Sequence, residues 1–120
     1  MDSEASISNL VNRHLISINS NAKSSAAIKL LTNSNVDMLP VLENGKLVGI
    51  FTKDSSNNDL VSSSMEKALF VEKNQDIDST IKYMLKHNIS RVPVVDSAIS
   101  MKCIGTISSS DLLKIKKNQK

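Results

Sequence analysis

Ser108 and Asp111, three residues apart, could together bind a phosphate and a diol. A helix is predicted to begin at Ser108, and the unpaired N–H groups and dipole of a helix start favour a phosphate. The Asp111 carboxylate would point back toward the same helix end, where it could accept two hydrogen bonds from a diol. Arg91 falls in a predicted neighbouring strand and could supply a positive charge for a phosphate oxygen.

The same spacing also has a purely structural interpretation. Ser-x-x-Asp at a helix start is close to a capping box, in which the serine alone contributes about 0.5–2 kcal/mol to stability without any ligand. Arg91 could equally be a solvated strand residue. Because a helix cap and a ligand contact can coexist, the residues alone leave both interpretations open.

The elements that must position these side chains occur twice in the chain. Residues 14–43 align with residues 67–96 without a gap, and an internal repeat of this kind governs the fold. Identical residues recur at Asn21/Asn74, Ile28/Ile81, Lys29/Lys82, Asn35/Asn88, Pro40/Pro93 and Val41/Val94. After the proline the second repeat is three residues longer, which aligns Thr52 with Ser108. One repeat of about 50 residues buries too little surface to fold alone, so the two should pack together.

Each repeat predicts the order strand, helix, strand, strand, helix. The predicted elements are strands over 15–18 and 68–71, helices over 22–33 and 76–87, strands over 38–42 and 91–95, strands over 47–51 and 102–107, and a closing helix that is poorly formed after Thr52 and clear over 109–117. Asn21 and Asn74 are the predicted helix starts, with Asp76 an alternative cap. The proline in each middle strand indicates a strand at a sheet edge, or a proline among the first residues of the strand.

Three local features complete the predicted organisation. Asn44-Gly45 is typical of a two-residue hairpin turn with positive φ. Residues 6–13 carry apolar side chains on one helical face and predict a short extra helix. Ser62-Ser63-Ser64 lies near the junction of the repeats and is predicted to be a linker.

Composition excludes several classes of protein. The formal net charge is +3, but four lysines lie in the last seven residues, so the body of the chain is close to neutral. A short lysine-rich end without aromatic residues is typical of a frayed, solvated terminus, so nucleic-acid binding is not expected. No apolar run approaches the roughly 20 residues that cross a membrane, and no secretory signal is present. We expect a cytoplasmic protein without a membrane contact.

The cysteine and histidine residues indicate neither a metal site nor a catalytic set. Cys103 is the one cysteine, and its apolar surroundings favour a buried thiol. His14 and His87 lie far apart, without a Cys or acidic pair at ligand spacing. No enzyme activity and no cofactor are therefore expected.

Two matched motifs give the chain a resemblance to a known family. They are Met38-Leu39-Pro40-Val41 with Gly49-Ile50-Phe51-Thr52, and Arg91-Val92-Pro93-Val94-Val95-Asp96 with Gly105-Thr106-Ile107-Ser108-Ser109-Ser110-Asp111. Over residues 8–116 the chain resembles the tandem CBS domain, also called a Bateman module. The resemblance implies an α/β (α+β) fold of two βαββα repeats, residues 1–60 and 61–120, packed sheet to sheet with pseudo-two-fold symmetry.

The resemblance also implies a regulatory function. In this family adenosine-containing ligands such as AMP, ADP, ATP or S-adenosylmethionine bind in clefts between the repeats, as regulatory ligands and not as cofactors. The Ser or Thr contacts phosphate or ribose, the Asp takes the ribose hydroxyls, and backbone of the first strand and the proline strand encloses the base. The implied site residues are Ala68, Leu69, Phe70, Ser90, Arg91, Val92, Pro93, Ser108 and Asp111, with a weaker first-repeat site at Ile16, Met38, Pro40 and Thr52. The family further implies a homodimer and an unknown regulated protein.

The first repeat departs from the family pattern. Ser55 stands at the position of Asp111, and Met38 replaces Arg91, with Asp37 beside it. A phosphate there would lose its cation and meet a carboxylate, so one competent nucleotide site is predicted, built mainly by the second repeat. The alternative to a ligand sensor is a ligand-free interaction module that regulates another protein by contact alone.

Overall fold

The computed structural model describes residues 6–55 and 58–118. These residues form two compact units, and each is described by itself. The first-repeat unit contains residues 16–55, 58–69 and 101–103, and the second-repeat unit contains residues 6–15, 70–100 and 104–118. Each unit contains one copy of the internal repeat. The division of the repeats between residues 60 and 61 stays a prediction.

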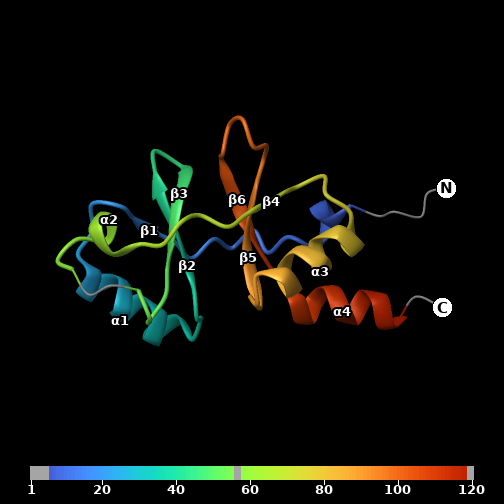
Figure 1. Ribbon diagram of the computed structural model, residues 1–120, viewed down its shortest axis with the longest axis horizontal. Helices are drawn as coiled ribbons and strands as arrows, with labels where there is room; N and C mark the ends of the chain where they lie inside the picture. Colours follow the sequence, from blue (N-terminus) through green and yellow to red (C-terminus); the bar gives the residue numbers. More distant parts are fainter. Residues whose placement is uncertain (1–5, 56–57, 119–120) are drawn as a thin grey trace. The chain divides into compact units, whose positions relative to one another are not determined.

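The first-repeat unit is a three-stranded mixed sheet with two helices (Figure 1). Its elements are β1 (Ile18–Asn19), α1 (Ser24–Ser34), β2 (Leu39–Glu43), β3 (Lys46–Phe51) and α2 (Val61–Ser64). The strands lie in the order β1-β2-β3, with β1 parallel and β3 antiparallel to β2. The buried core residues are Ala27, Leu31, Leu39, Val41, Phe51 and Val61.

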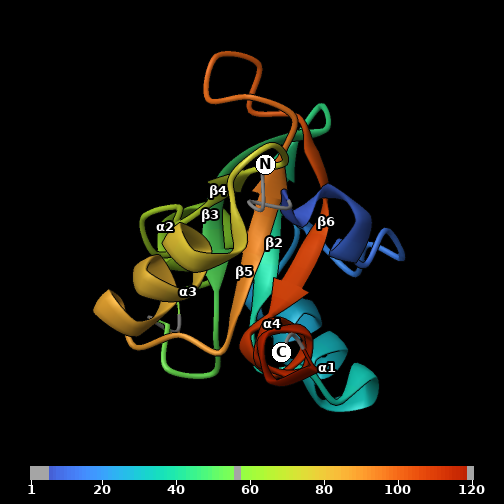
Figure 2. The same ribbon diagram turned by 90° about the vertical axis from the view of Figure 1, so that its right-hand side faces the viewer.

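The second-repeat unit repeats this arrangement. Its elements are η1 (Ile7–Leu10), β4 (Val71–Glu72), α3 (Ile77–Lys86), β5 (Arg91–Val95), β6 (Cys103–Ser108) and α4 (Ser109–Asn118), with strand order β4-β5-β6. The buried core residues are Ile7, Val71, Ile77, Met84, Val92, Val94, Ile107 and Leu112. Figure 2 looks nearly along α4 and shows α3 beside it. The predicted mixed α/β fold and the order strand, helix, strand, strand, helix are confirmed in both units.

Both proline-containing strands are central in their sheets, so the prediction of an edge strand is wrong. The alternative holds, because Pro40 is the second residue of β2 and Pro93 the third of β5. The neighbouring parallel strands β1 and β4 are only two residues long and pair from Val41 and Val94 onward. Each proline therefore lies just before the paired residues, where a missing N–H costs no bond to the parallel neighbour.

The starts of the two long helices differ. Asp76 caps α3, and its carboxylate accepts a hydrogen bond from the Ser79 N–H at 3.2 Å, as the alternative prediction has it. The prediction of Asn21 as the start of α1 is wrong, because α1 begins after Lys23, which makes no side-chain cap. A backbone carbonyl replaces the cap, since the Ser24 N–H donates to the oxygen of Asp59 at 2.8 Å.

Three other predicted local features need correction. The predicted serine linker is helical, since residues 61–64 form α2 with Val61 and Ser64 buried. No helix follows Thr52 directly; residues 53–54 form a turn. The predicted helix over 6–13 is a 3₁₀ helix limited to Ile7–Leu10. The hairpin turn is confirmed, with positive φ at Asn44 and Gly45.

Each sheet gains a short antiparallel partner from the segment that precedes a repeat. Asn12 pairs with Thr106 beside β6, and Glu66 pairs with Ile50 beside β3. The preceding segment comes close to the strand at Gly105, next to Thr106, and at Gly49, next to Ile50. A Cβ on Gly105 would lie 2.3 Å from the Asn12 oxygen, and one on Gly49 would lie 2.6 Å from the Met65 Sδ. Glycine at these two positions therefore lets the preceding segment reach the sheet.

Candidate functional site

Ser108 and Asp111 meet where β6 ends and α4 begins. The Ser108 Oγ accepts a hydrogen bond from the Asp111 N–H at 3.2 Å and lies 3.2 Å from the Ser110 Oγ. Ser108 is buried, whereas the side chain of Asp111 is exposed. The serine is thus a helix cap, as one interpretation of the motif predicts, and it leaves the Asp111 carboxylate facing solvent.

Ser90 and Arg91 lie beside this helix start. The Ser109 N–H donates to the Ser90 carbonyl oxygen at 2.9 Å, which joins the start of β5 to the start of α4. The Arg91 Nη1 donates to the Thr106 Oγ1 at 3.1 Å, and the arginine is half-buried. Within the second-repeat unit the fold therefore places a carboxylate and a hydroxyl at the start of α4, and it bonds the Arg91 guanidinium to Thr106, two residues before Ser108 on β6.

The other predicted residues of the second-repeat site contribute differently. Val92 and Pro93 are buried in β5, so only their backbone could contact a ligand. The Phe70 N–H donates to the Tyr83 Oη at 3.1 Å, which fixes the backbone just before β4. Ala68 and Leu69 are half-buried residues of the first-repeat unit, and their contribution to a site with Ser108 stays a prediction.

In the first-repeat unit, Thr52 and Ser55 form a closed hydrogen-bonded turn after β3. The Thr52 Oγ1 accepts from the Asp54 N–H at 3.1 Å, and the Ser55 Oγ accepts from the Thr52 N–H at 2.9 Å. Both hydroxyls donate to one carboxylate oxygen, the Oε2 of Glu66, at 3.2 Å from Thr52 and 2.7 Å from Ser55. Sequence reasoning missed Glu66, because it reaches the turn through an isolated β-bridge that hydrophobic periodicity does not predict.

The remaining residues of the predicted weaker site carry no cation. Met38 and Pro40 are buried, and Ile16 is half-buried. Met38 matches Arg91 in the repeat, so the first-repeat unit has a buried thioether where the second has a guanidinium. Asp37 next to it is exposed, and the loss of a favourable phosphate environment stays a prediction.

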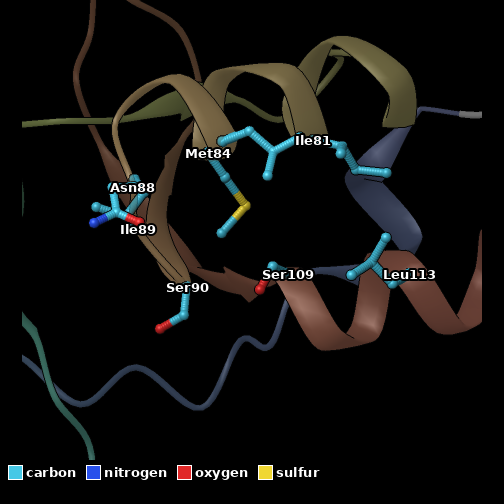
Figure 3. A pocket seen from close by; sticks show the side chains of 8 residues that line it. Ile81, Met84, Asn88, Ile89, Ser90, Ser109 and Leu113 are labelled. Atoms are coloured by element: carbon cyan, nitrogen blue, oxygen red, sulfur yellow. The ribbon is translucent and has the colours of Figure 1, made fainter.

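An apolar groove runs between α3 and α4 and reaches Ser90 and Ser109, near the start of α4. It has a volume of about 290 Å³, and its lining residues are Ile81, Met84, Leu85, Asn88, Ile89, Ser90, Ser109 and Leu113 (Figure 3). Leu85 is 76% exposed and Leu113 54% exposed. Sequence reasoning missed this groove, although leucines left on the outer face of a helix are a usual signal of an interaction surface.

The residues that the structure describes contain no group of three or more His, Cys, Asp or Glu side chains arranged to hold a metal ion. Among the helices in the described ranges, none has the length and apolar character needed to span a bilayer.

Comparison with known proteins identifies relatives, one of them of matching length. A CBS domain-containing protein of Methanocaldococcus jannaschii is 28% identical, and the alignment covers 94% of this chain and 96% of that protein. The L-aspartate semialdehyde sulfurtransferase of the same organism is also 28% identical over 91% of this chain, but the chain spans only 23% of that enzyme. The similarity to the enzyme is therefore confined to a part of it.

Solved structures and family models agree with this comparison. The crystal structure of a CBS domain pair in complex with 5′-methylthioadenosine and S-adenosyl-L-methionine is 26% identical, with a TM-score of 0.82 and coverage of 98% of this chain and 100% of that one. The family model of the CBS domain matches residues 7–55 and again residues 59–118. Both halves of the internal repeat are thus matched, and the chain belongs to the CBS domain family, as a tandem pair.

Proposed function

We propose that this chain is a non-enzymatic regulatory module that binds an adenosine-containing ligand and signals its presence to a partner protein in the cytoplasm. The observation that carries the proposal is the exposed Asp111 carboxylate at the helix start that the Ser108 hydroxyl caps, with the Arg91 guanidinium bonded to Thr106 just before it. A diol, a phosphate and a base are the chemical parts of an adenine nucleotide. The Asp111 carboxylate is an acceptor for the diol, and the Arg91 guanidinium at the start of β5 is a donor for the phosphate.

Each residue has a defined task in the proposed complex. Asp111 accepts hydrogen bonds from both ribose hydroxyls, and a charged acceptor strengthens such bonds about twofold over neutral ones. Arg91 and the positive end of the α4 dipole face the phosphate. The adenine would lie against the backbone of Phe70 and of residues 92–93. The similar CBS domain pair crystallised with 5′-methylthioadenosine and S-adenosyl-L-methionine supports this ligand class.

The protein would transmit binding by preferring one conformation when the ligand is present. A ligand shifts a conformational equilibrium only by the difference in its affinity for the two states. AMP, ADP, ATP and S-adenosylmethionine are the candidate ligands, and none of them acts as a cofactor in this scheme. The partner protein would recognise the shape that the ligand favours.

We also propose that the module is a homodimer. The groove between α3 and α4 presents Leu85 and Leu113 to solvent, and burying each leucine would stabilise a dimer by roughly 1.5–3 kcal/mol. The same groove favours the alternative function, a ligand-free module that binds its partner through this surface. Binding of adenosine compounds separates the two functions.

Isothermal titration calorimetry with AMP, ADP, ATP and S-adenosylmethionine tests the proposed function. The wild-type protein should bind at least one compound, and a ligand at 100 times its Kd should stabilise the fold by about 2.7 kcal/mol. Asp111→Asn should abolish this binding. Asp78→Asn is the matched control, because Asp78 is also an exposed aspartate in the first turn of a helix. The absence of any binding at millimolar concentration would refute the proposal and leave the ligand-free module.

A further inference from the structure

The hydroxyls of Thr52 and Ser55 have no proton left for a ligand. Each hydroxyl accepts one backbone N–H from its own turn, and each gives its single proton to the Oε2 of Glu66. A fully ionised phosphate has hydrogen-bond acceptors and no donors. A phosphate bound at this turn would therefore need the same two hydroxyl protons. The Glu66 carboxylate therefore occupies, from within the protein, the acceptor position that a phosphate would take.

Strand pairing anchors Glu66 at this position. Its N–H donates to the Ile50 oxygen at 2.8 Å, and its own carbonyl oxygen accepts from the Ile50 N–H at 3.0 Å. Ile50 lies in β3, two residues before Thr52, which directly follows the strand. The carboxylate therefore does not depend on a flexible backbone to reach the turn, although its side chain is exposed.

The corresponding position in the second-repeat unit is neutral. Asn12 pairs with Thr106 as Glu66 pairs with Ile50, with backbone distances of 2.8 and 3.1 Å. The Asn12 Oδ1 accepts from the His14 N–H at 3.0 Å, so this side chain is tied to its own segment. One repeat thus carries a negative charge against its hydroxyls, and the other carries an uncharged amide at the matching site.

We propose that Glu66 is a specificity determinant that closes the Thr52–Ser55 turn to anionic ligands. The Glu66 carboxylate accepts the protons of both hydroxyls. Its negative charge would also repel a phosphate that came within hydrogen-bonding distance of Thr52 and Ser55. The inference rests on the proposed binding of adenosine ligands, and it assigns phosphate-bearing ligands to the second repeat alone. The first repeat is left to ligands without a phosphate.

A site-resolved NMR titration of the full ¹⁵N-labelled chain tests this inference, with inorganic phosphate and AMP as separate probes. In the wild-type protein, phosphate should leave the amide signals of residues 52–55 in place. In Glu66→Ala the same signals should move, with an apparent Kd for phosphate lowered at least about tenfold. Asp59→Ala is the control, because it removes an exposed carboxylate from the same unit and should behave like the wild type.

Two results would overturn the role of Glu66. One is movement of the signals of residues 52–55 in the wild type at the phosphate concentration that moves them in Glu66→Ala. The other is no movement in either protein. The AMP titration reports separately on the proposed function, through the signals of residues 108–111. If those signals do not respond, the proposed binding of AMP at the second repeat fails, while the phosphate result at residues 52–55 still decides the role of Glu66.

Discussion

The hydroxyl oxygens of Ser24 and Ser64 lie 2.8 Å apart inside the first-repeat unit, although the two residues are 40 positions apart in the sequence. Both side chains are buried. The Ser64 hydroxyl also accepts the Asn58 N–H at 3.0 Å and lies 3.0 Å from the Leu60 oxygen. A single hydroxyl thus ties the start of α1 to α2 and to the segment leading into it.

Ser64→Ala should therefore destabilise the protein. The substitution leaves the buried Ser24 hydroxyl and the Asn58 N–H without this partner, and an unsatisfied buried polar group costs about 1–3 kcal/mol. Urea unfolding measures the change in the free energy of unfolding. Ser62→Ala, at an exposed position of the same helix, should change it by less than about 0.5 kcal/mol. Equal effects of the two substitutions would contradict the role given to Ser64.

The two close approaches at glycine give a second, comparative prediction. Gly105→Ala places a methyl group 2.3 Å from the backbone oxygen of Asn12, whereas Gly49→Ala meets the flexible end of the Met65 side chain at 2.6 Å and a backbone oxygen, that of Glu66, at 2.9 Å. Overpacking typically costs about 1–3 kcal/mol, and a backbone obstacle relaxes less than a thioether. Chemical unfolding should therefore show a larger loss of stability for Gly105→Ala. A larger loss for Gly49→Ala would show that the Asn12 segment moves away easily.

The repeated sequence pattern predicts the elements well because local rules determine them. Asn35 and Asn88 are identical in the repeat, and both adopt a positive φ just after a helix, a conformation that asparagine tolerates better than most residues. The Asp76 cap and the Asn44-Gly45 turn follow from equally local chemistry. Such features require only a few neighbouring residues.

The features that the sequence did not reveal depend on partners far away in the chain. Serines 62–64 have the composition of a linker, but the segment is helical, and its Ser64 hydroxyl is buried in a hydrogen bond with Ser24. Glu66 reaches Thr52 because of a bridge to Ile50 that no periodicity indicates. The residues at the helix start of α4 could be predicted, whereas the carboxylate that distinguishes the first repeat could not.

The cap of α3 predicts a dependence of stability on pH. Hydrogen bonds from the side chain and the backbone N–H of Ser79 hold the pKa of Asp76 below its ordinary value. A lowered pKa in the folded state stabilises the fold at pH values above the unfolded pKa, about 3.9 for an aspartate, and this stabilisation is lost as the pH falls through the folded pKa. The stability difference between the wild type and Asp76→Ala should therefore be constant above about pH 5 and shrink below pH 4. Unfolding curves at a series of pH values measure it, and a difference that grows on acidification would contradict the assignment.

The groove between α3 and α4 predicts the effect of one charge on assembly. Leu85→Glu places a carboxylate on the proposed dimer surface and should raise the dimer dissociation constant at least about tenfold, as judged from the value of one buried leucine. Analytical ultracentrifugation over a range of concentrations gives this constant. Ile99→Glu is the matched control, because Ile99 is 96% exposed in the turn before β6, away from both helices. A wild-type protein that stays monomeric at all concentrations would refute the dimer.

Arg91→Met gives the second repeat the residue that the first repeat has at this position. Methionine fills similar space but cannot donate to a phosphate, so the affinity for AMP should fall at least about tenfold, the value of a hydrogen bond to a charged group. The affinity for adenosine, which has no phosphate, should change by less than about twofold, since Asp111 still receives the ribose hydroxyls. Calorimetric titration of both compounds measures the two changes.

The contact of Arg91 with Thr106 requires its own control. Thr106→Val removes the oxygen that accepts from the Arg91 Nη1 at 3.1 Å but leaves the guanidinium in place. AMP should therefore bind Thr106→Val much as it binds the wild type. If Arg91→Met weakened AMP and adenosine equally, the arginine would support the fold of the site and not the phosphate. A loss confined to AMP in Arg91→Met, with binding kept in Thr106→Val, would identify Arg91 as the cation that recognises the phosphate.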